Sequence, residues 1–295
     1  MNQDRDRNSQ RVAVTGGSGL AGSFVVQALV EAGYEVLCLD RAAPAAPICP
    51  YKIADATDLG QMVTCLQGMD AVVHFAAIPR PTFEPADVVF RTNTQAMFAV
   101  LEAAALLQIK RIVYASSISV LGYPFYARFF EPEYAPIDEA HPRAPQDVYA
   151  LSKHLGEEMA AAYARRTDMT IISLRMPWIH TPETFERQIT PLWANPAAGA
   201  SNLWSYIDAR DVGLACRLSL EADLRGHEAF FIAAEDTFMP IPTADLLRAH
   251  YPHTELRPGL EGRASVLSSA RAKAQIGYIP RFNWGMYELE RPLQP

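Results

Sequence analysis

The chain has 295 residues, 49% of them hydrophobic and 20% charged, which is typical of a globular protein with one large domain or two closely packed ones. A formal net charge of −7 and a sequence pI of about 5.5 argue against nucleic acid or an anionic membrane as the main partner. The four scattered cysteines lack metal-ligand spacing, so we expect no bound metal. The polar start lacks a signal-peptide core, and no apolar run approaches the ~20 residues of a membrane span. We therefore expect a cytoplasmic protein with reduced thiols.

Alternating strand and helix patterns fill the first two thirds of the chain. Short apolar runs predict strands at 11–15, 35–40, 51–54, 70–76, 110–115 and 169–174. Helical periodicity predicts helices at 19–33, 58–67, 85–108 and 145–167. Because these strands are apolar on both faces and alternate with helices, the pattern predicts an α/β fold with a parallel sheet that helices cover on both sides.

The pattern changes after Pro177, where prolines recur and the elements become shorter. Two further strands are predicted at 204–207 and 229–233. We therefore expect a doubly wound Rossmann domain at 10–176, to which 204–234 returns, and a smaller C-terminal substrate-binding lobe at 177–203 and 235–295. Such a lobe would close over the carboxyl edge of the sheet, where doubly wound folds bind their ligands.

A glycine-rich segment joins the first predicted strand to the first helix. Gly16, Gly19 and Gly22 are spaced so that the first allows a tight turn, the second lets a pyrophosphate approach the backbone, and the third lets the helix pack against the sheet. The helix would add free N–H groups and the positive end of its dipole. We therefore expect a dinucleotide here, with Ser18 and Leu20 among its contacts; the alternative is a glycine-rich turn without a ligand.

The adenosine half of the dinucleotide would meet residues that follow the second and third strands. Asp40 ends the second strand, where its carboxylate would bond the ribose hydroxyls and repel a 2′-phosphate, so NAD is favoured over NADP. Arg41 lies beside it and would favour NADP instead, unless it is a solvated loop residue. Asp55 and Ala56 follow the third strand and would meet the adenine, although Asp55 is also suited to cap the helix ahead of Leu59.

Several short motifs occur together in this chain. They are the loop at 15–22, Asp55, HFAA at 74–77, Asn93, YASSISVLG at 114–122 and YALSK at 149–153. This combination resembles the extended short-chain dehydrogenases/reductases of the NAD-dependent epimerase/dehydratase family, from about Arg11 to Arg175 and weakly at 206–215 and 268–280. The resemblance implies NAD as the cofactor, a small-molecule substrate, and a homodimer formed through the helices at 85–108 and 145–167.

The resemblance also assigns further residues around the cofactor. Phe75, Ala76 and Ala77 would form the cofactor-facing end of their strand, where small side chains let the dinucleotide lie close. Pro177 would lie against the nicotinamide carboxamide. Asn93 resembles the cofactor-side asparagine of the family, unless it is only a polar residue on the face of its helix.

Tyr149 and Lys153 lie four residues apart on a predicted helix, so their side chains share one face. An ammonium ~4 Å from the phenol would stabilise the phenolate by roughly 4 kcal/mol at an effective dielectric of ~20. Burial opposes this effect, so we expect the pKa of Tyr149 to fall by about two or three from its ordinary value near 10. Tyr149 would then exchange a proton with a substrate hydroxyl near neutral pH. The alternative is a solvated helix face that has this spacing by chance.

A pair of serines follows the strand at 110–115. Ser117 would lie at the carboxyl end of that strand and hydrogen-bond the same substrate oxygen as Tyr149. The resemblance assigns it as the family's catalytic serine or threonine, with Ser116 as the alternative register; otherwise the two serines would serve only as a turn or helix cap. Ser117, Tyr149 and Lys153 are therefore the predicted catalytic residues.

Two departures from the family pattern bear on the reaction. Ser117 is followed by Ile118 and Ser119, so the acid that dehydratases and decarboxylases of the family carry there is missing. Trp178 stands where nucleotide-sugar members usually have an asparagine that holds the diphosphate. We therefore expect a dehydrogenase that acts on a small sugar, sugar acid or related polyol, which Ser117, Ser119 and Trp178 would contact. The alternatives are a nucleotide-sugar epimerase and a NAD-binding sensor without catalysis.

Several other residues have more than one interpretation. A substrate carboxylate would be held by Arg128, Arg187 or His180. The alternative is that each of them is a surface residue. The aromatic loop at 123–134 is either a lid over the site or a satellite core or dimer contact. His74 is more typical of a packed strand residue than of a catalyst, and Asp211 is more typical of a helix cap than of a catalytic acid.

Overall fold

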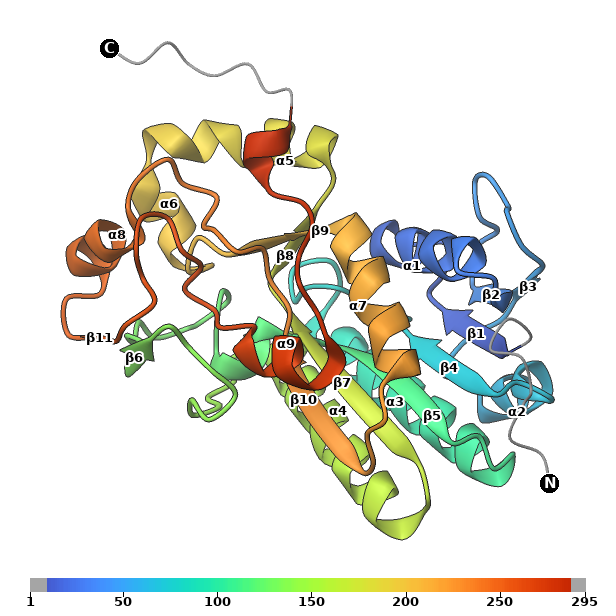
Figure 1. The fold of residues 1–295 in the computed structure, drawn as a ribbon. Helices are drawn as coiled ribbons and strands as arrows, with labels where there is room; N and C mark the ends of the chain where they lie inside the picture. The colour runs from blue at the N-terminus through green and yellow to red at the C-terminus, as the bar shows by residue number, and fades with distance from the viewer. Residues whose placement is uncertain (1–9, 288–295) are drawn as a thin grey trace.

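The computed structural model describes residues 10–287. The polar start at 1–9 and the end of the expected second lobe at 288–295 therefore lie outside the described residues. A seven-stranded parallel sheet forms the centre of the molecule, in the order β10-β7-β5-β4-β1-β2-β3 (Figure 1). Its strands are β1 (Arg11–Thr15), β2 (Glu35–Asp40), β3 (Tyr51–Ile53), β4 (Ala71–His74), β5 (Arg111–Ser117), β7 (Thr170–Met176) and β10 (His227–Phe231). This arrangement confirms the predicted doubly wound Rossmann fold.

Helices cover both faces of this sheet (Figure 1). One face carries α1 (Leu20–Glu31), α7 (Ala209–Glu221) and α9 (Ala270–Ile276), and the other carries α2 (Leu59–Leu66), α3 (Ala86–Leu106) and α4 (Val148–Arg166). Alternate residues of β5 supply both cores, since Val113 belongs to the core under α1 and α7 while Ile112 belongs to the core under α3 and α4. None of the helices within residues 10–287 has the length and apolar character needed to cross a membrane.

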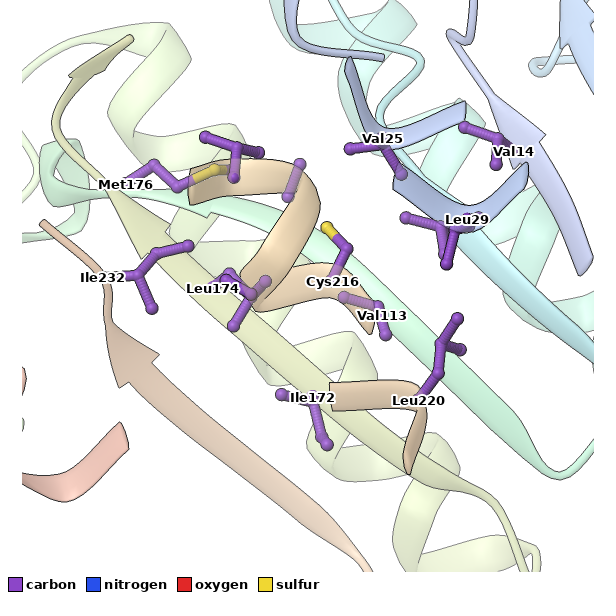
Figure 2. Close-up of a cluster of buried hydrophobic side chains, with 14 of the residues drawn as sticks. Val14, Val25, Leu29, Val113, Ile172, Leu174, Met176, Cys216, Leu220 and Ile232 are labelled. Carbon is purple, nitrogen blue, oxygen red and sulfur yellow. The ribbon is translucent and has the colours of Figure 1, made fainter. Parts of the chain in front are cut away.

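Aliphatic side chains fill the core between the sheet and helices α1 and α7 (Figure 2). Ile172 projects from β7, Leu29 from α1 and Leu220 from α7, and the first two are fully buried. Full burial of such a side chain contributes about 1.5–3 kcal/mol. The two helices approach closely at Gly213, where a Cβ atom would lie 2.7 Å from the Cβ of Ala28. This packing holds the carboxyl ends of the central strands in a fixed arrangement.

A second lobe packs over the carboxyl edge of the sheet around an aromatic core. Its helices and strands are β6 (Tyr134–Ala135), β8 (Trp178–His180), α5 (Pro182–Gln188), α6 (Pro196–Ala200), β9 (Tyr206–Asp208), α8 (Thr243–His250) and β11 (Glu255–Leu256), with short 3-10 helices η2 (Ile118–Leu121), η3 (Thr190–Ala194) and η4 (Trp284–Met286). Phe185, Trp204 and Phe238 are fully buried in its core. Ile118, which follows β5, belongs to the same core and so ties the lobe to the sheet.

The main departure from the expected secondary structure concerns the strand predicted at 204–207. β9 begins at Tyr206 and pairs with β8 in a separate two-stranded sheet, not with the seven-stranded one. Leu203 and Trp204 have φ angles of +54° and +48°, which an extended strand does not include. Both side chains are fully buried. Their apolar character therefore reflects the core of the second lobe and not a strand.

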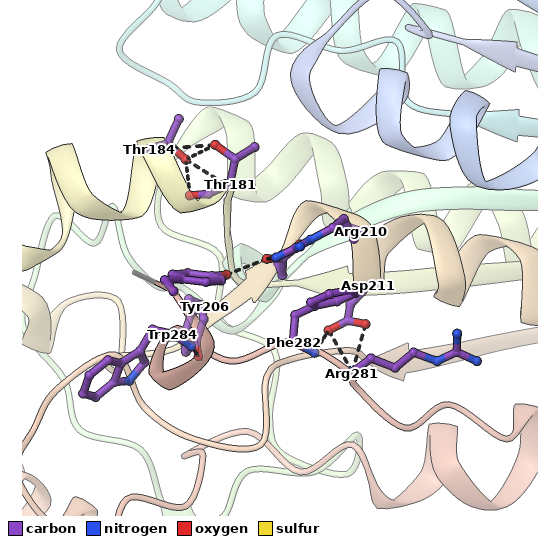
Figure 3. Close-up of polar contacts among 10 residues, drawn as sticks. Thr181, Thr184, Tyr206, Arg210, Asp211, Arg281, Phe282 and Trp284 are labelled. Carbon is purple, nitrogen blue, oxygen red and sulfur yellow. Dashed lines mark hydrogen bonds and ion pairs between the residues drawn. The ribbon is translucent and has the colours of Figure 1, made fainter. Parts of the chain in front are cut away.

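Hydrogen bonds to a buried carboxylate hold the last described segment against α7 (Figure 3). The carboxylate of Asp211 accepts N–H bonds from Arg281 and Phe282 at 3.0 Å. Burial raises the pKa of Asp211 to about 6, although these bonds oppose the rise. The residue that caps α7 is Asp208, which accepts from the N–H of Arg210 at 2.8 Å. The interpretation of Asp211 as a helix cap is therefore wrong, because it anchors a distant segment instead.

The aromatic loop at 123–134 is tied into the second lobe. Tyr123 is fully buried, and its ring centroid lies 6.4 Å from that of Tyr251, which directly follows α8. Pro124 and Phe125 line the large cavity described below. The loop is thus anchored as a satellite core and also contributes to the wall of the site.

Candidate active site

A cavity of about 910 Å³ lies at the carboxyl ends of the central strands, with the second lobe on its other side. It brings together most of the residues that the sequence singles out. Those that line it are Gly16, Gly19, Leu20, Gly22, Asp40, Arg41, Asp55, Ala56, Phe75, Ala76, Ala77, Ser117, Ser119, Tyr149, Lys153, Pro177 and Trp178. Ser18 and Asn93 are the two predicted site residues that do not line it.

The glycine-rich loop leaves the start of α1 open toward the cavity. Gly16 has a φ of +73°, and a Cβ atom there would lie 2.5 Å from the backbone nitrogen of Ala76. A Cβ atom at Gly22 would lie 2.0 Å from the carbonyl oxygen of Gly16, so only glycine allows this close packing. Gly19 caps α1 without a side-chain hydrogen bond, whereas aspartates cap α2, α4 and α7. The uncapped N–H groups and the helix dipole fit the pyrophosphate of a dinucleotide.

Asp40 is held in place by backbone N–H groups. Its carboxylate accepts from the N–H of Ser18 at 3.0 Å and from the N–H of Arg41 at 2.7 Å. The hydroxyl of Ser18 donates to the carbonyl oxygen of Ala42 at 2.8 Å. Ser18 therefore positions Asp40 from behind the cavity wall, and Asp40 itself lines the cavity at the end of β2.

Asp55 does not cap the helix that follows it. The cap of α2 is Asp58, which accepts from the N–H of Gln61 at 3.0 Å. Asp55 instead accepts from the N–H of Thr57 at 2.9 Å and from its hydroxyl at 2.8 Å. The cap interpretation of Asp55 is therefore wrong, and Asp55 remains with Ala56 on the cavity wall.

Tyr149 and Lys153 are presented by the first turns of α4. Asp147 caps this helix by accepting N–H bonds from Tyr149 at 2.8 Å and Ala150 at 3.0 Å. Both predicted catalytic side chains are buried. The Nζ of Lys153 donates to the carbonyl oxygen of Ala115 at 2.7 Å and lies 5.7 Å from the centroid of the Tyr149 ring. Lys153 thus fastens α4 to the end of β5 and keeps its charge near the phenol.

The pKa of Tyr149 is opposite in direction to the sequence-based expectation. Burial raises it to about 12, although the polar side chain of Ser117 lowers it. Burial also lowers the pKa of Lys153 to about 7. The expectation was wrong because it gave desolvation too little weight: the ammonium bonds a backbone carbonyl, and the phenolate would lose its hydration in this buried position.

The two adjacent serines have different partners. The hydroxyl of Ser116 donates to Glu157 at 2.7 Å, and Glu157 also accepts from Arg175 at 2.9 and 2.8 Å. Ser117 opposes the rise that burial causes in the pKa of Tyr149, and its hydroxyl donates to the hydroxyl of Ser119 at 3.0 Å and accepts the N–H of Ser119 at 3.1 Å. The geometry therefore favours Ser117 over Ser116 as the partner of Tyr149 in the cavity.

Asn93 and His74 lie behind the cavity wall. The amide of Asn93 accepts the N–H of Ile78 at 2.8 Å and donates to its carbonyl at 3.1 Å and to the hydroxyl of Ser152 at 3.1 Å. Asn93 thus positions the loop after β4 relative to α4. His74 contacts the hydroxyl of Thr15 at 2.7 Å, and burial lowers its pKa to about 3. It is a neutral packed strand residue, as the sequence indicated.

The cavity also includes residues that the motifs did not identify. Among these are Arg80, Phe83, Thr184 and Gln188. Arg80 follows the HFAA segment by three residues, and a cation just beyond the carboxyl end of a parallel strand is the signal that could have identified it. Within residues 10–287, no group of three or more His, Cys, Asp or Glu side chains is placed to hold a metal ion.

Of the three residues suited to hold a carboxylate, only Arg187 lines the cavity. Arg128 is exposed and outside it. His180 is fully buried, its Nδ1 lies 3.3 Å from the hydroxyl of Thr184, and burial lowers its pKa to about 4. It is therefore a neutral core residue of the second lobe at physiological pH.

Known proteins match much of this chain. The model of the "NAD dependent epimerase/dehydratase family" matches residues 12–233. A uronate dehydrogenase of Pseudomonas syringae pv. tomato is 28% identical over 187 residues, which is 62% of this chain and 64% of that protein. A UDP-glucose 4-epimerase of Azospirillum brasilense is 34% identical over 167 residues, 53% of this chain and 45% of that protein. The matched part of the chain thus spans less than two thirds of the length of either relative.

The fold is shared over nearly the whole chain with a solved structure. A short-chain dehydrogenase/reductase superfamily protein from Agrobacterium tumefaciens, crystallised with bound NAD, superposes with a TM-score of 0.71 and 21% identity. The superposition covers 94% of each chain. At this identity the likeness concerns the fold.

Proposed function

Because this chain belongs to the NAD dependent epimerase/dehydratase family, with NAD as its cofactor, we propose that it is a dehydrogenase of a small sugar, sugar acid or related polyol. The observation that carries the proposal is the convergence of Ser117, Tyr149 and Lys153 in the cavity that the open start of α1 also lines. Other members of the family act as epimerases, so the choice of reaction needs its own argument.

The glycine loop and Asp40 would hold the cofactor. The open N-terminus of α1 would bind the pyrophosphate, and Asp40 would accept the ribose hydroxyls and disfavour a 2′-phosphate, so we propose NAD over NADP. Phe75, Ala76 and Ala77 would let the dinucleotide lie along the strand ends. Bound NAD supplies the hydride acceptor of the reaction, or the donor in its reduced form.

Tyr149 would exchange the proton of the substrate hydroxyl. Near neutral pH its raised pKa keeps the phenol protonated and ready to donate to a carbonyl oxygen. In the oxidative direction Tyr149 must accept a proton, and the charges of Lys153 and of the oxidised nicotinamide both favour its phenolate. Ser117, which lines the same cavity as Tyr149, would orient the same substrate oxygen.

Trp178 supports a small substrate. It replaces the asparagine that would hold a nucleotide diphosphate, and its ring lies on the cavity wall 4.6 Å from the ring centroid of His180. The similarity to a uronate dehydrogenase favours the same substrate class. The similarity to a UDP-glucose 4-epimerase favours the second candidate, a nucleotide-sugar epimerase, whose substrate would have to pass Trp178.

A substrate panel tests the proposal. The purified protein is given NAD or NADP with free sugars, sugar acids and nucleotide sugars, and reduced cofactor is read by absorbance. Net reduction of NAD with a free sugar or sugar acid is the expected result. Interconversion of nucleotide-sugar epimers without net reduction would establish the epimerase instead. Absence of turnover with every substrate, together with retained NAD binding, would support the non-catalytic sensor.

We also propose that the protein is a cytoplasmic homodimer formed through α3 and α4. Phe98 and Leu106 on α3 and Leu151 on α4 are exposed apolar side chains on these helices. Light scattering should give twice the chain mass of 32.6 kDa, and Leu151→Glu should reduce it to the monomer mass. A wild-type protein of monomer mass would refute the dimer.

A further inference from the structure

The ionisable side chains that line the cavity are unevenly distributed along the sheet edge. At the end formed after β2 and β3 lie Asp40, Arg41 and Asp55. From the loop after β4, from α4 and from α5 come Arg80, Lys153 and Arg187. β1 and β4 lie between β2 and β5, so the ends of β2 and β5 are about 14 Å apart at ~4.8 Å per strand. Within residues 10–287, no carboxylate lines the cavity near the catalytic residues.

Arg80 is a half-buried cation beside the catalytic tyrosine. Its Cζ lies 4.3 Å from the centroid of the Phe83 ring, a cation–π contact that restrains the side chain. Arg80 and Tyr149 line the same cavity. Burial and the charge of Asp147 raise the pKa of Tyr149, and the charge of Arg80 lowers it. In the described part of the chain, Arg80 has no ion pair with a carboxylate.

Arg187 is presented by a helix with a fixed orientation. Thr181 and Thr184 form a capping box at the start of α5, with N–H to hydroxyl distances of 2.8 and 3.3 Å (Figure 3). Phe185 is fully buried in the core of the second lobe, which fixes the rotation of the helix. Thr184, Arg187 and Gln188 therefore border the cavity together, and the exposed Arg187 has no ion pair within residues 10–287.

We propose that Arg80 and Arg187 bind an anionic oxygen group of the sugar, either a carboxylate or a phosphate ester, so that the enzyme acts on acidic rather than neutral sugars. The proposal rests on the dehydrogenase function above and narrows its substrate class. A guanidinium donates parallel N–H bonds to such a group. Because neither arginine has an ion pair within residues 10–287, neither must break one to bind the substrate. Anchoring the anionic end would determine which hydroxyl reaches Tyr149 and Ser117.

Substrates that differ in one group test this assignment. Galacturonate, galactose 6-phosphate and galactose differ only at C6, and the glucose series offers the same comparison. With NAD, we expect kcat/KM for one of the acidic sugars to exceed that for the neutral sugar roughly tenfold or more. The preferred acid identifies the group as carboxylate or phosphate. Equal kcat/KM for neutral and acidic sugars would refute the anion site but not the proposed dehydrogenase activity. No reduction of NAD with any of these sugars would refute both proposals.

Variants of the two arginines provide the second test. Arg80→Gln and Arg187→Gln should each raise KM for the acidic sugar roughly 10- to 100-fold. Arg187→Gln should change kcat/KM for the neutral sugar by less than about threefold, whereas Arg80→Gln should affect the neutral sugar only through Tyr149, and so less than the acidic one. Arg128→Gln removes an exposed arginine outside the cavity and is the matched control, with unchanged constants for both sugars. Equal losses with both sugars would contradict the assignment.

The pH profile distinguishes Arg80 from a merely structural residue. Loss of its charge disfavours the phenolate, so Arg80→Gln should move the limb of kcat/KM that reports Tyr149 to higher pH with either sugar. Arg80→Lys retains the positive charge and should therefore keep the wild-type pH limb. The loss of the paired N–H donors should still weaken binding of the acidic sugar. An unmoved limb in a folded Arg80→Gln enzyme would show that Arg80 does not act on Tyr149.

Discussion

The buried ion pair between Glu157 and Arg175 predicts that one carboxylate of α4 contributes far more stability than its neighbour. Glu157 accepts two bonds from Arg175, at 2.9 and 2.8 Å, and one from Ser116 at 2.7 Å. The two side chains are only 1% and 5% exposed. Glu158, the next residue, pairs with Arg143 at 2.9 Å but is 50% exposed. Arg143 also lies 3.4 Å from Glu157, so the two glutamates share this arginine and differ in burial and in the bonds of Glu157 to Arg175 and Ser116.

The expected magnitudes follow from that difference. Glu157→Gln keeps the shape of the side chain but leaves the guanidinium of Arg175 buried without a counter-charge, which costs about 3–5 kcal/mol of unfolding free energy. Glu158→Gln removes a solvent-screened pair and should cost no more than about 1 kcal/mol. Since Ser116 precedes Ser117, Glu157→Gln should also lower kcat by loosening the end of β5, while Glu158→Gln should not.

The pH dependence adds a second readout. Burial opposes the ionisation of Glu157, but the hydrogen bonds and charge of Arg175 outweigh it and hold the pKa below its ordinary value of 4.5. The contribution of Glu157 is thus present above that value and is lost as pH falls through the lower pKa of the folded state. Urea unfolding followed by circular dichroism at neutral pH and near pH 4 measures both effects. Equal losses in the two variants at neutral pH would refute the reasoning.

Three further predictions concern single residues. Tyr149→Phe should lower kcat about 10²- to 10⁴-fold while NAD affinity, measured by fluorescence titration, stays unchanged, and a kcat near that of the wild type would exclude Tyr149 from proton transfer. Asp40→Ala should raise the ratio of kcat/KM for NADP to that for NAD roughly tenfold, because repulsion of the 2′-phosphate is removed, and a constant ratio would exclude Asp40 from cofactor selection. The pKa of Asp211 is raised from 3.8 to about 6, so its contribution to stability is present below about pH 4 and is lost as pH rises through 6. Asp211→Asn should therefore flatten the pH dependence of the melting temperature in this range, and identical profiles would contradict the raised pKa.

The location of the site could be predicted because it depends on local patterns. Short apolar runs that alternate with helices require a covered parallel sheet, and the carboxyl edge of such a sheet collects its loops. The glycine spacing and the four-residue separation of Tyr149 and Lys153 are properties of a turn and of one helix face. Such features need no knowledge of distant contacts, and most of the predicted site residues do line the cavity.

Tertiary contacts decided the remaining roles, since these depend on partners far away in the chain. The sequence does not distinguish Ser116 from Ser117. In the structure Ser116 donates its hydroxyl proton to Glu157 on α4, whereas Ser117 influences the pKa of Tyr149. The direction of the pKa of Tyr149 depends on burial by several elements, which the spacing to Lys153 does not reveal.

The sequence by itself determined the sheet, the glycine-rich loop and the helix face shared by Tyr149 and Lys153, because backbone geometry and periodicity act over a few neighbouring residues. Only the tertiary structure decided that Leu203 and Trp204 belong to a lobe core rather than a strand, and that Arg80 and Arg187 border one cavity. Burial and electrostatic environment are set by all the elements that pack around a group, and those elements meet only in the folded chain.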